Sequence, residues 1–121
     1  MNYGKYFNES EFACSHCGKV AMDQEHIDRV NALRESVGFP LKVSSGYRCP
    51  EHPLEAKKSK PGAHTTGKAT DLAVDGGKAY RVLAVGMEMG FKGIGVQQKG
   101  AGRFIHLDDW DNPNRPTVWS Y

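Results

Sequence analysis

Glycine and proline punctuate this chain so closely that its helices and strands must be short. Fourteen glycines and six prolines are spread over 121 residues, and both residue types interrupt regular secondary structure. Two segments remain long enough for a helix of several turns. Residues 23–37 carry apolar side chains at three- to four-residue spacing and end before Gly38, and residues 76–89 begin at a glycine pair and end before Gly90. We therefore expect two main helices joined by short elements.

The remaining apolar segments have the length and alternation of strands. Four such segments precede the C-terminal tail. Residues 50–68, between the first and the second segment, are rich in Pro, Lys, Gly and Thr, which favours a loop. This order predicts an α+β fold with a small, mainly antiparallel sheet in one domain over residues 1–121, with an irregular segment at 1–21 and a tail that docks on the body. The expected strands are residues 41–45, 69–74, 93–97 and 104–107.

Composition excludes several classes of protein. Hydrophobic residues make up 39% and charged residues 25% of the chain, which is typical of a globular domain rather than a disordered one. The net charge of +2 is far from the cationic density of a dedicated nucleic-acid binder, and no apolar run is long enough to insert into a membrane. The first residues lack the pattern of a secretory signal, so we expect synthesis in the cytoplasm, and a chain of this size is expected to be a monomer.

Side chains that could carry chemistry gather in three places. These are residues 45–48, residues 64–71 and residues 106–108. Two histidines and one carboxylate are enough for a catalytic zinc site whose fourth position stays open for water. His106 and Asp108 are two residues apart on an expected strand, so they share a face, as a metal ligand and a general base would.

Spacing alone leaves a plainer interpretation open. His64 could be an ordinary loop histidine, Asp71 a carboxylate near the start of a strand, and His106 a half-buried histidine without a metal.

The motifs around these residues resemble a known family. The stretch His64-x-x-Gly67-x-Ala69-x-Asp71 resembles the Ser-x-His-x-x-Gly-x-Ala-x-Asp motif of the zinc D-Ala-D-Ala carboxypeptidases and L-alanyl-D-glutamate peptidases, which are bacterial and phage peptidoglycan peptidases related to the hedgehog domain. Residues 44–52 are similar to the Ser-Gly-Tyr-Arg segment of that family, residues 102–108 to its Phe-Ile/Val-His-Val/Ile-Asp strand, and residues 115–121 to the end of its short members. The resemblance covers nearly the whole chain from Phe7.

The resemblance implies a metal site and a reaction. His64, Asp71 and His106 would be the ligands of one catalytic Zn²⁺, and Arg48 would polarise the scissile carbonyl or bind a substrate carboxylate, with Ser45 beside it on the substrate side. A zinc-bound water would then attack a peptide bond in the peptidoglycan stem. The bond could be D-Ala-D-Ala, L-Ala-D-Glu or D-Ala-diaminopimelate.

The setting of such a reaction is left open by the resemblance. The enzyme would act on the cell wall after release from the cytoplasm, as a phage endolysin, as part of a virion or as a cell-wall remodelling enzyme. The alternative is a non-catalytic, zinc-containing module of the same fold that binds the cell wall or a protein.

This sequence departs from the family pattern at two positions. Gly62 stands where the family has its motif serine, so one substrate hydrogen bond is missing. Arg103 stands three residues before His106, where many relatives have an acidic general base, and an arginine cannot act as a base at ordinary pH. We therefore expect the base to be Asp108, which would take a proton from water and pass it to the leaving amine.

The three cysteines suggest a second metal site. Cys14-x-x-Cys17 and Cys49-x-x-His52 together provide the ligands of a structural Cys₃His zinc site. His16 is an alternative fourth ligand. A disulfide from Cys14 or Cys17 to Cys49, or three free thiols packed as small apolar groups, are the other interpretations.

Overall fold

The computed structural model describes residues 1–121 and contains one five-stranded sheet with the strand order β1-β2-β4-β3-β5. All neighbouring strands are antiparallel except β3 and β5, which are parallel. This confirms the α+β class and the mainly antiparallel sheet. The strands are β1 (Val43–Ser45), β2 (Ala69–Leu72), β3 (Gly93–Gln97), β4 (Phe104–Asp108) and β5 (Thr117–Ser120).

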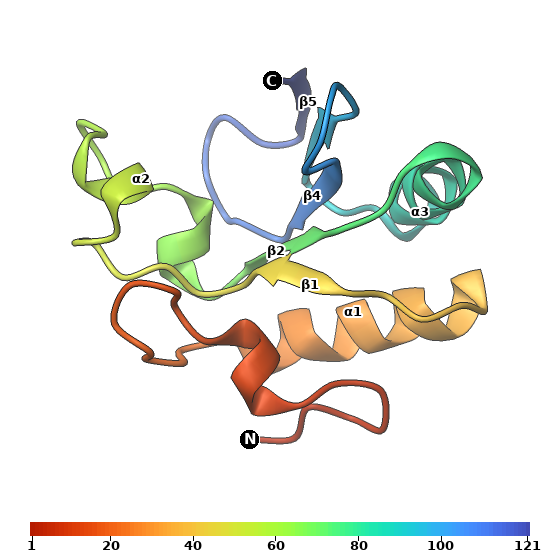
Figure 1. The fold of residues 1–121 in the computed structure, drawn as a ribbon, viewed down its shortest axis with the longest axis horizontal. Coiled ribbons are helices and arrows are strands. Elements are labelled where there is room, and N and C mark those ends of the chain that lie inside the picture. Colours follow the sequence, from red (N-terminus) through yellow and green to blue (C-terminus); the bar gives the residue numbers. More distant parts are fainter.

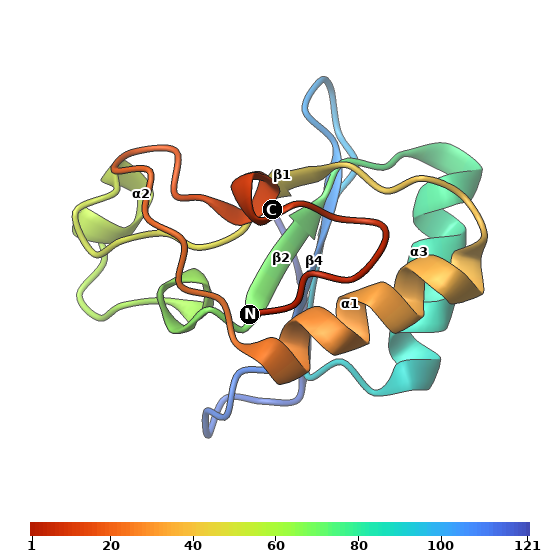
Figure 2. The same cartoon turned by 90° about the horizontal axis from the view of Figure 1, so that it is seen from below.

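Both expected helices are present and begin and end as the sequence indicates. Helix α1 (Gln24–Val37) starts after Asp23, whose side chain accepts the backbone N–H of His26, and it ends at Gly38, which has a φ of 79°. Helix α3 (Gly76–Met89) ends in the same way at Gly90. Figures 1 and 2 show α1 and α3 packed against each other on one side of the sheet, with the short helix α2 (Pro53–Ala56) on the other side.

The sheet has an apolar face and a polar face because side chains alternate along each strand. On β4, Ile105 and Leu107 are fully buried in the main core. Leu107 packs closely against Gly86 of α3, because a Cβ added to this glycine would lie only 3.1 Å from a methyl group of Leu107. His106 and Asp108 lie on the opposite face of the same strand. The helices therefore cover one face, and the other face carries the polar side chains.

Three segments differ from their expected form. The expected loop at residues 50–68 contains α2 and a 3₁₀ helix, η2 (Ala63–Thr66), and the irregular N-terminal segment contains η1 (Glu9–Phe12). The C-terminal tail does dock on the body, and it does so as strand β5 at the edge of the sheet. No helix in the structure has the length and apolar character needed to cross a membrane.

Candidate metal centre

One row of residues crosses the polar face of the sheet and forms the base of the site. Asp71 on β2 is the direct partner of His106 on β4, and Ser45 on β1 is the partner of Asp71. On the other side, Gly95 on β3 is the partner of His106, and Trp119 on β5 is the partner of Gly95. Because directly opposite residues project to the same face, strand pairing alone brings a carboxylate, an imidazole and an indole together.

Gly95 makes room for the indole of Trp119 in this row. A Cβ at position 95 would lie 2.8 Å from Nε1 of Trp119 and 3.0 Å from the hydroxyl of Tyr121. The indole can therefore lie across β3, where its ring centroid is 5.0 Å from that of His106. Trp119 can thus line the site only because residue 95 is a glycine and has no side chain.

His64 reaches the same point from η2, which precedes β2. The turn after η2 is made by Gly67, whose φ of 75° and close approach to the carbonyl oxygen of Ala21 both require glycine. Nδ1 of His64 lies 2.7 Å from the carbonyl oxygen of Gly46. A carbonyl oxygen only accepts hydrogen bonds, so Nδ1 carries the proton and Nε2 of the neutral ring has a free lone pair.

His106 is oriented in the corresponding way by Asp108. Its Nε2 donates to Oδ2 of Asp108 at 2.7 Å, which leaves the lone pair of the neutral ring on Nδ1. Nδ1 of His106 lies 2.9 Å from Oδ1 of Asp71 and 3.2 Å from Nε2 of His64, and Nε2 of His64 lies 3.2 Å from the same oxygen of Asp71. Three electron-pair donors therefore converge on one point.

The electrostatics of this cluster suit a cation. Burial lowers the pKa of His64, which keeps its ring neutral. Burial alone would raise the pKa of Asp71, but the polar surroundings formed by His106 and His64 outweigh it and hold the pKa of this carboxyl well below its usual range. One carboxylate and two imidazoles, all buried and with ligand atoms within 4.8 Å of one another, form a donor set that fits Zn²⁺.

The bonding of Asp108 does not support its expected role as the general base. Asp108 is fully buried, and its oxygens are occupied by Nε2 of His106, the backbone N–H of Trp110 and the guanidinium of Arg115 at 3.1 and 2.8 Å. Burial opposes ionisation, but the hydrogen bonds from His106 and Arg115 outweigh it and lower the pKa of Asp108. Asp108 shares a strand face with His106, as expected, but lies behind the ring, where it fixes the tautomer.

Arg115 is a residue of this site that sequence reasoning missed. It forms a two-pronged ion pair with Asp108, and its guanidinium carbon lies 4.9 Å from the ring centroid of Trp119 and 5.1 Å from that of Trp110. Nothing in the spacing of the motifs indicates this contact, because Arg115 lies in the connection between β4 and β5.

Arg48 lies at the edge of the centre, next to the ligand Asp71. Its Nη2 is 3.4 Å from Oδ2 of Asp71, its Nε donates to Oγ of Ser45 at 3.1 Å, and its Nη1 is 3.3 Å from Oε2 of Glu55. The guanidinium is therefore held by three groups, and both Arg48 and Ser45 line the cleft in front of the ligands. Sequence reasoning placed both residues on the substrate side, and that role stays a prediction.

Glu55 is a second residue that sequence reasoning missed, and it bears on the unusual Gly62. Oε1 of the buried Glu55 accepts the backbone N–H of Gly62 at 2.9 Å, and its Oε2 binds Nζ of Lys58 at 2.9 Å. A Cβ at position 62 would lie 3.0 Å from Oε1 of Glu55 and 2.7 Å from Nζ of Lys58. Glu55 thus occupies the space beside the position of the family's motif serine.

The ligands open into a cleft of about 670 Å³. Four aromatic side chains line it, Phe104, Trp110, Trp119 and Tyr121, together with the cations of Arg48, Lys57, Lys58 and Arg115. Asp71 is the only carboxylate that lines this cleft. The arrangement can bind an anionic, partly apolar ligand next to a metal, but it presents no separate acidic base.

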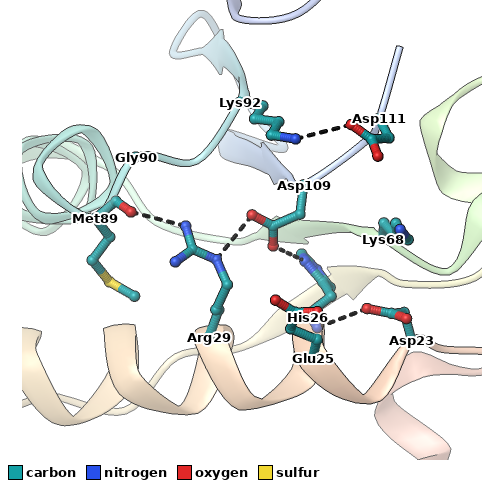
Figure 3. Close-up of a pocket in the computed structure, with 10 residues that line it drawn as sticks. All are labelled: Asp23, Glu25, His26, Arg29, Lys68, Met89, Gly90, Lys92, Asp109 and Asp111. Atoms are coloured by element: carbon teal, nitrogen blue, oxygen red, sulfur yellow. Dashed lines mark hydrogen bonds and ion pairs between the residues drawn. The ribbon is translucent and has the colours of Figure 1, made fainter.

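A second polar pocket, of about 370 Å³, lies behind the sheet at the N-terminal end of α1 (Figure 3). There Asp109 points toward α1, where it binds Nδ1 of His26 at 2.7 Å and Nε of Arg29 at 2.9 Å. Nε2 of His26 lies 2.9 Å from the hydroxyl of Thr70. His26 is fully buried, and this network satisfies both of its ring nitrogens.

The three cysteines also converge, without the expected histidine. The sulfur atoms of Cys14, Cys17 and Cys49 lie within 4.8 Å of one another, and all three thiols are free. Nδ1 of His52 instead accepts the backbone N–H of Leu54 at 3.1 Å, and its Nε2 lies 3.0 Å from the hydroxyl of Ser15. His52 caps α2, so the expected set of four ligands is not assembled.

The chain matches the model of a known protein family. A family model described as Peptidase M15 matches residues 5–108, a range that contains His64, Asp71 and His106 together with Arg48 and Asp108. A search of curated proteins finds no match.

Proposed function

This chain belongs to the Peptidase M15 family of zinc metallopeptidases, and we propose that it cleaves a peptide bond in the stem peptide of peptidoglycan. The observation that carries the proposal is the tautomer of the two histidines. The carbonyl of Gly46 and the carboxylate of Asp108 each fix one proton, so that the lone pairs of His64 and His106 face Oδ1 of Asp71 at 3.2 and 2.9 Å. Two lone pairs that face a carboxylate oxygen repel it, and a cation between the three atoms would turn this repulsion into attraction.

His64, Asp71 and His106 would hold the zinc ion. When bound, zinc polarises a carbonyl group and lowers the pKa of a coordinated water. Asp108, itself held by Arg115, fixes the orientation of His106 and keeps a proton on its Nε2, since outer partners of this kind fix the ligand geometry of a metal site.

The walls of the cleft suit a short peptide that carries carboxylates. Arg48 is held next to Asp71, where a guanidinium can stabilise the negative charge that develops on the scissile carbonyl. Lys57 and Lys58 add positive charge to the lining of the cleft, and the ring of Trp119 adds apolar surface. Stem peptides contain several carboxylates and small apolar side chains, and both match these walls.

The test is digestion of purified peptidoglycan by the zinc-loaded protein, followed by mass analysis of the fragments. New amino termini are expected, and the fragment masses distinguish a D-Ala-D-Ala, an L-Ala-D-Glu and a D-Ala-diaminopimelate bond. His106→Ala should remove both the cleavage and the zinc of this centre. The Asp109→Asn variant is a matched control, because Asp109 neighbours Asp108 but points into the other pocket.

A second candidate function is supported by the absence of a free carboxylate in the cleft. Because Asp71 is the only carboxylate there, the chain could bind zinc and a cell-wall peptide without turnover. In that case the zinc-loaded protein would sediment with intact peptidoglycan and release no fragments. Sedimentation without cleavage across peptidoglycans of different stem composition would favour this binding module over the peptidase.

We also propose that either activity is exerted on the cell wall after the chain leaves the cytoplasm. This proposal is supported by the cationic and aromatic lining of the cleft, which suits a cell-wall peptide, and by membership of the Peptidase M15 family. Lysis of intact cells after the protein is added from outside, compared with digestion of isolated cell walls, would test where the protein can act.

A further inference from the structure

Three cysteines that have no part in the proposed reaction meet at the N-terminal end of the fold. Cys14 and Cys17 belong to the segment between η1 and α1, and Cys49 lies directly after Arg48 in the segment that follows β1. Their sulfur atoms lie within 4.8 Å of one another. Cys14 and Cys49 are buried, whereas Cys17 is exposed. Two separate parts of the chain therefore contribute to one cluster of thiols.

The backbone around Cys14 and Cys17 forms a tight turn that turns both sulfur atoms to the same side. The N–H of Gly18 donates to the carbonyl of Cys14 at 2.8 Å, and the N–H of Cys14 donates to the carbonyl of Lys19 at 2.8 Å. Gly18 closes the turn with a φ of 77°, a conformation that L side chains rarely adopt. The spacing of the two cysteines is the C-x₂-C spacing of metal-binding turns.

The sulfur of Cys14 is placed as the acceptor of several backbone N–H groups. The N–H of Cys49 lies 3.3 Å from it, and the N–H groups of Cys17 and His16 also point toward it. Such a cradle stabilises a thiolate, the form that binds metals.

We propose that Cys14, Cys17 and Cys49 bind a second zinc ion, separate from the centre of His64, Asp71 and His106. Three thiolates are a soft donor set that suits Zn²⁺. Cys17 is exposed, so a water molecule from solvent can supply a fourth ligand. His52 is not a ligand, because both of its ring nitrogens are engaged elsewhere.

This second ion would fix the segment that supports the first centre. The N–H of Tyr47 donates to the carbonyl of Phe12, and a Cβ on Gly46 would lie 2.7 Å from the Cα of Phe12. The carbonyl of Gly46 is the partner of His64, and Arg48 precedes Cys49. Joining Cys49 to the turn at Cys14 and Cys17 therefore holds the backbone that orients His64 and Arg48. The ion has a structural role.

The test uses the His106→Ala variant of the full chain, which lacks the first centre. We expect this variant to retain about one zinc per chain, and to give intense near-ultraviolet absorption from thiolate-to-metal charge transfer when Co²⁺ replaces zinc. Adding Cys17→Ser should abolish that absorption and weaken zinc retention against a chelator. Cys17 is exposed, so this change creates no buried cavity, and Ser15→Ala in the same turn is the matched control that should keep both signals.

Two results would overturn the proposal. One is a His106→Ala protein that binds neither Zn²⁺ nor Co²⁺ while its three thiols titrate as free. The other is a mass two hydrogen atoms lower than that of the reduced chain, which would show a disulfide among the cysteines. Neither result depends on peptidase activity, so this proposal and the proposed function can fail independently.

Discussion

Asp108 lies directly behind His106, with Oδ2 of the carboxylate 2.7 Å from Nε2 of the ring. Arg115 then holds both oxygens of the same carboxylate. The resulting series of contacts runs from a guanidinium through a carboxylate to an imidazole whose remaining nitrogen faces Asp71. Its consequence is that a residue without access to the cleft fixes which nitrogen of His106, a candidate metal ligand, carries the proton.

Asp108→Asn should therefore weaken metal binding. An amide lacks the charge that Arg115 and His106 require, and changes to partners of metal-ligating histidines typically cost about 10–100-fold in metal affinity or activity. Zinc affinity, measured by chelator competition, should decrease by about 10–100-fold. Activity should decrease with it. If Asp108 were a general base, zinc affinity would stay unchanged while activity was lost. Asp109→Asn is the control and should leave zinc affinity at the wild-type value.

Gly93→Ala should disturb the same centre from the neighbouring strand. Gly93 is the strand partner of Asp108, and a Cβ there would lie only 2.1 Å from Oδ2 of the carboxylate. Asp108 would have to leave its position behind His106, at a cost of about 1–3 kcal/mol in the free energy of unfolding. Thermal unfolding and zinc affinity should both decline.

The matched control for this change is Gly77→Ala in the first turn of α3. A Cβ at position 77 meets no atom within 4 Å, and alanine favours a helix over glycine by up to about 1 kcal/mol. This variant should be as stable as the parent or more so, with unchanged zinc affinity. Equal behaviour of the two variants would contradict the role assigned to Gly93.

Thr70→Val should destabilise the chain without affecting its chemistry. The series Thr70, His26 and Asp109 has the order of a hydroxyl–imidazole–carboxylate triad, but both Thr70 and His26 are fully buried. Removing the hydroxyl leaves Nε2 of His26 without a partner, which costs about 1–3 kcal/mol. Chemical denaturation should show this loss, while zinc content and cleavage per folded molecule stay unchanged. Loss of cleavage at full stability would instead identify Thr70 as a nucleophile.

The stability of the metal-free chain should fall at acid pH, in part through Glu55. Burial would raise the pKa of this carboxyl, but Lys58, the N–H of Gly62 and Arg48 outweigh it and lower the pKa. A lowered pKa in the folded state means that the carboxylate stabilises the fold above its ordinary pKa of about 4.3. This contribution is lost as the pH falls below that value.

The urea midpoint of the metal-free chain, followed by circular dichroism between pH 7 and pH 3, measures this effect. Glu55→Gln should lower the midpoint at pH 7 and reduce the difference between the two pH values. Glu51→Gln is the control, because Glu51 is exposed in the same loop. An unchanged pH dependence in the Glu55 variant would contradict the stabilising role of this carboxylate.

The sequence by itself determined the elements and the residues that could bind a metal. Helix α1 and its C-terminal end followed from apolar periodicity and Gly38, because capping and helical spacing are local properties of the chain. The three candidate ligand positions followed from a resemblance in motifs, and strand alternation correctly placed His106 and Asp108 on one face. The N-terminal cysteine pair was likewise visible as a spacing.

Only the tertiary structure decided what each of these residues can do. Whether Asp108 faces the cleft or the back of His106 depends on the space above Gly93 and on Arg115, which are brought close by strand pairing and by the turn before β5. The burial of His26 depends on Asp109 and Thr70, both distant in sequence. A residue type and its spacing specify a capacity for chemistry, but protonation and access are set by neighbours that meet only when the chain is folded.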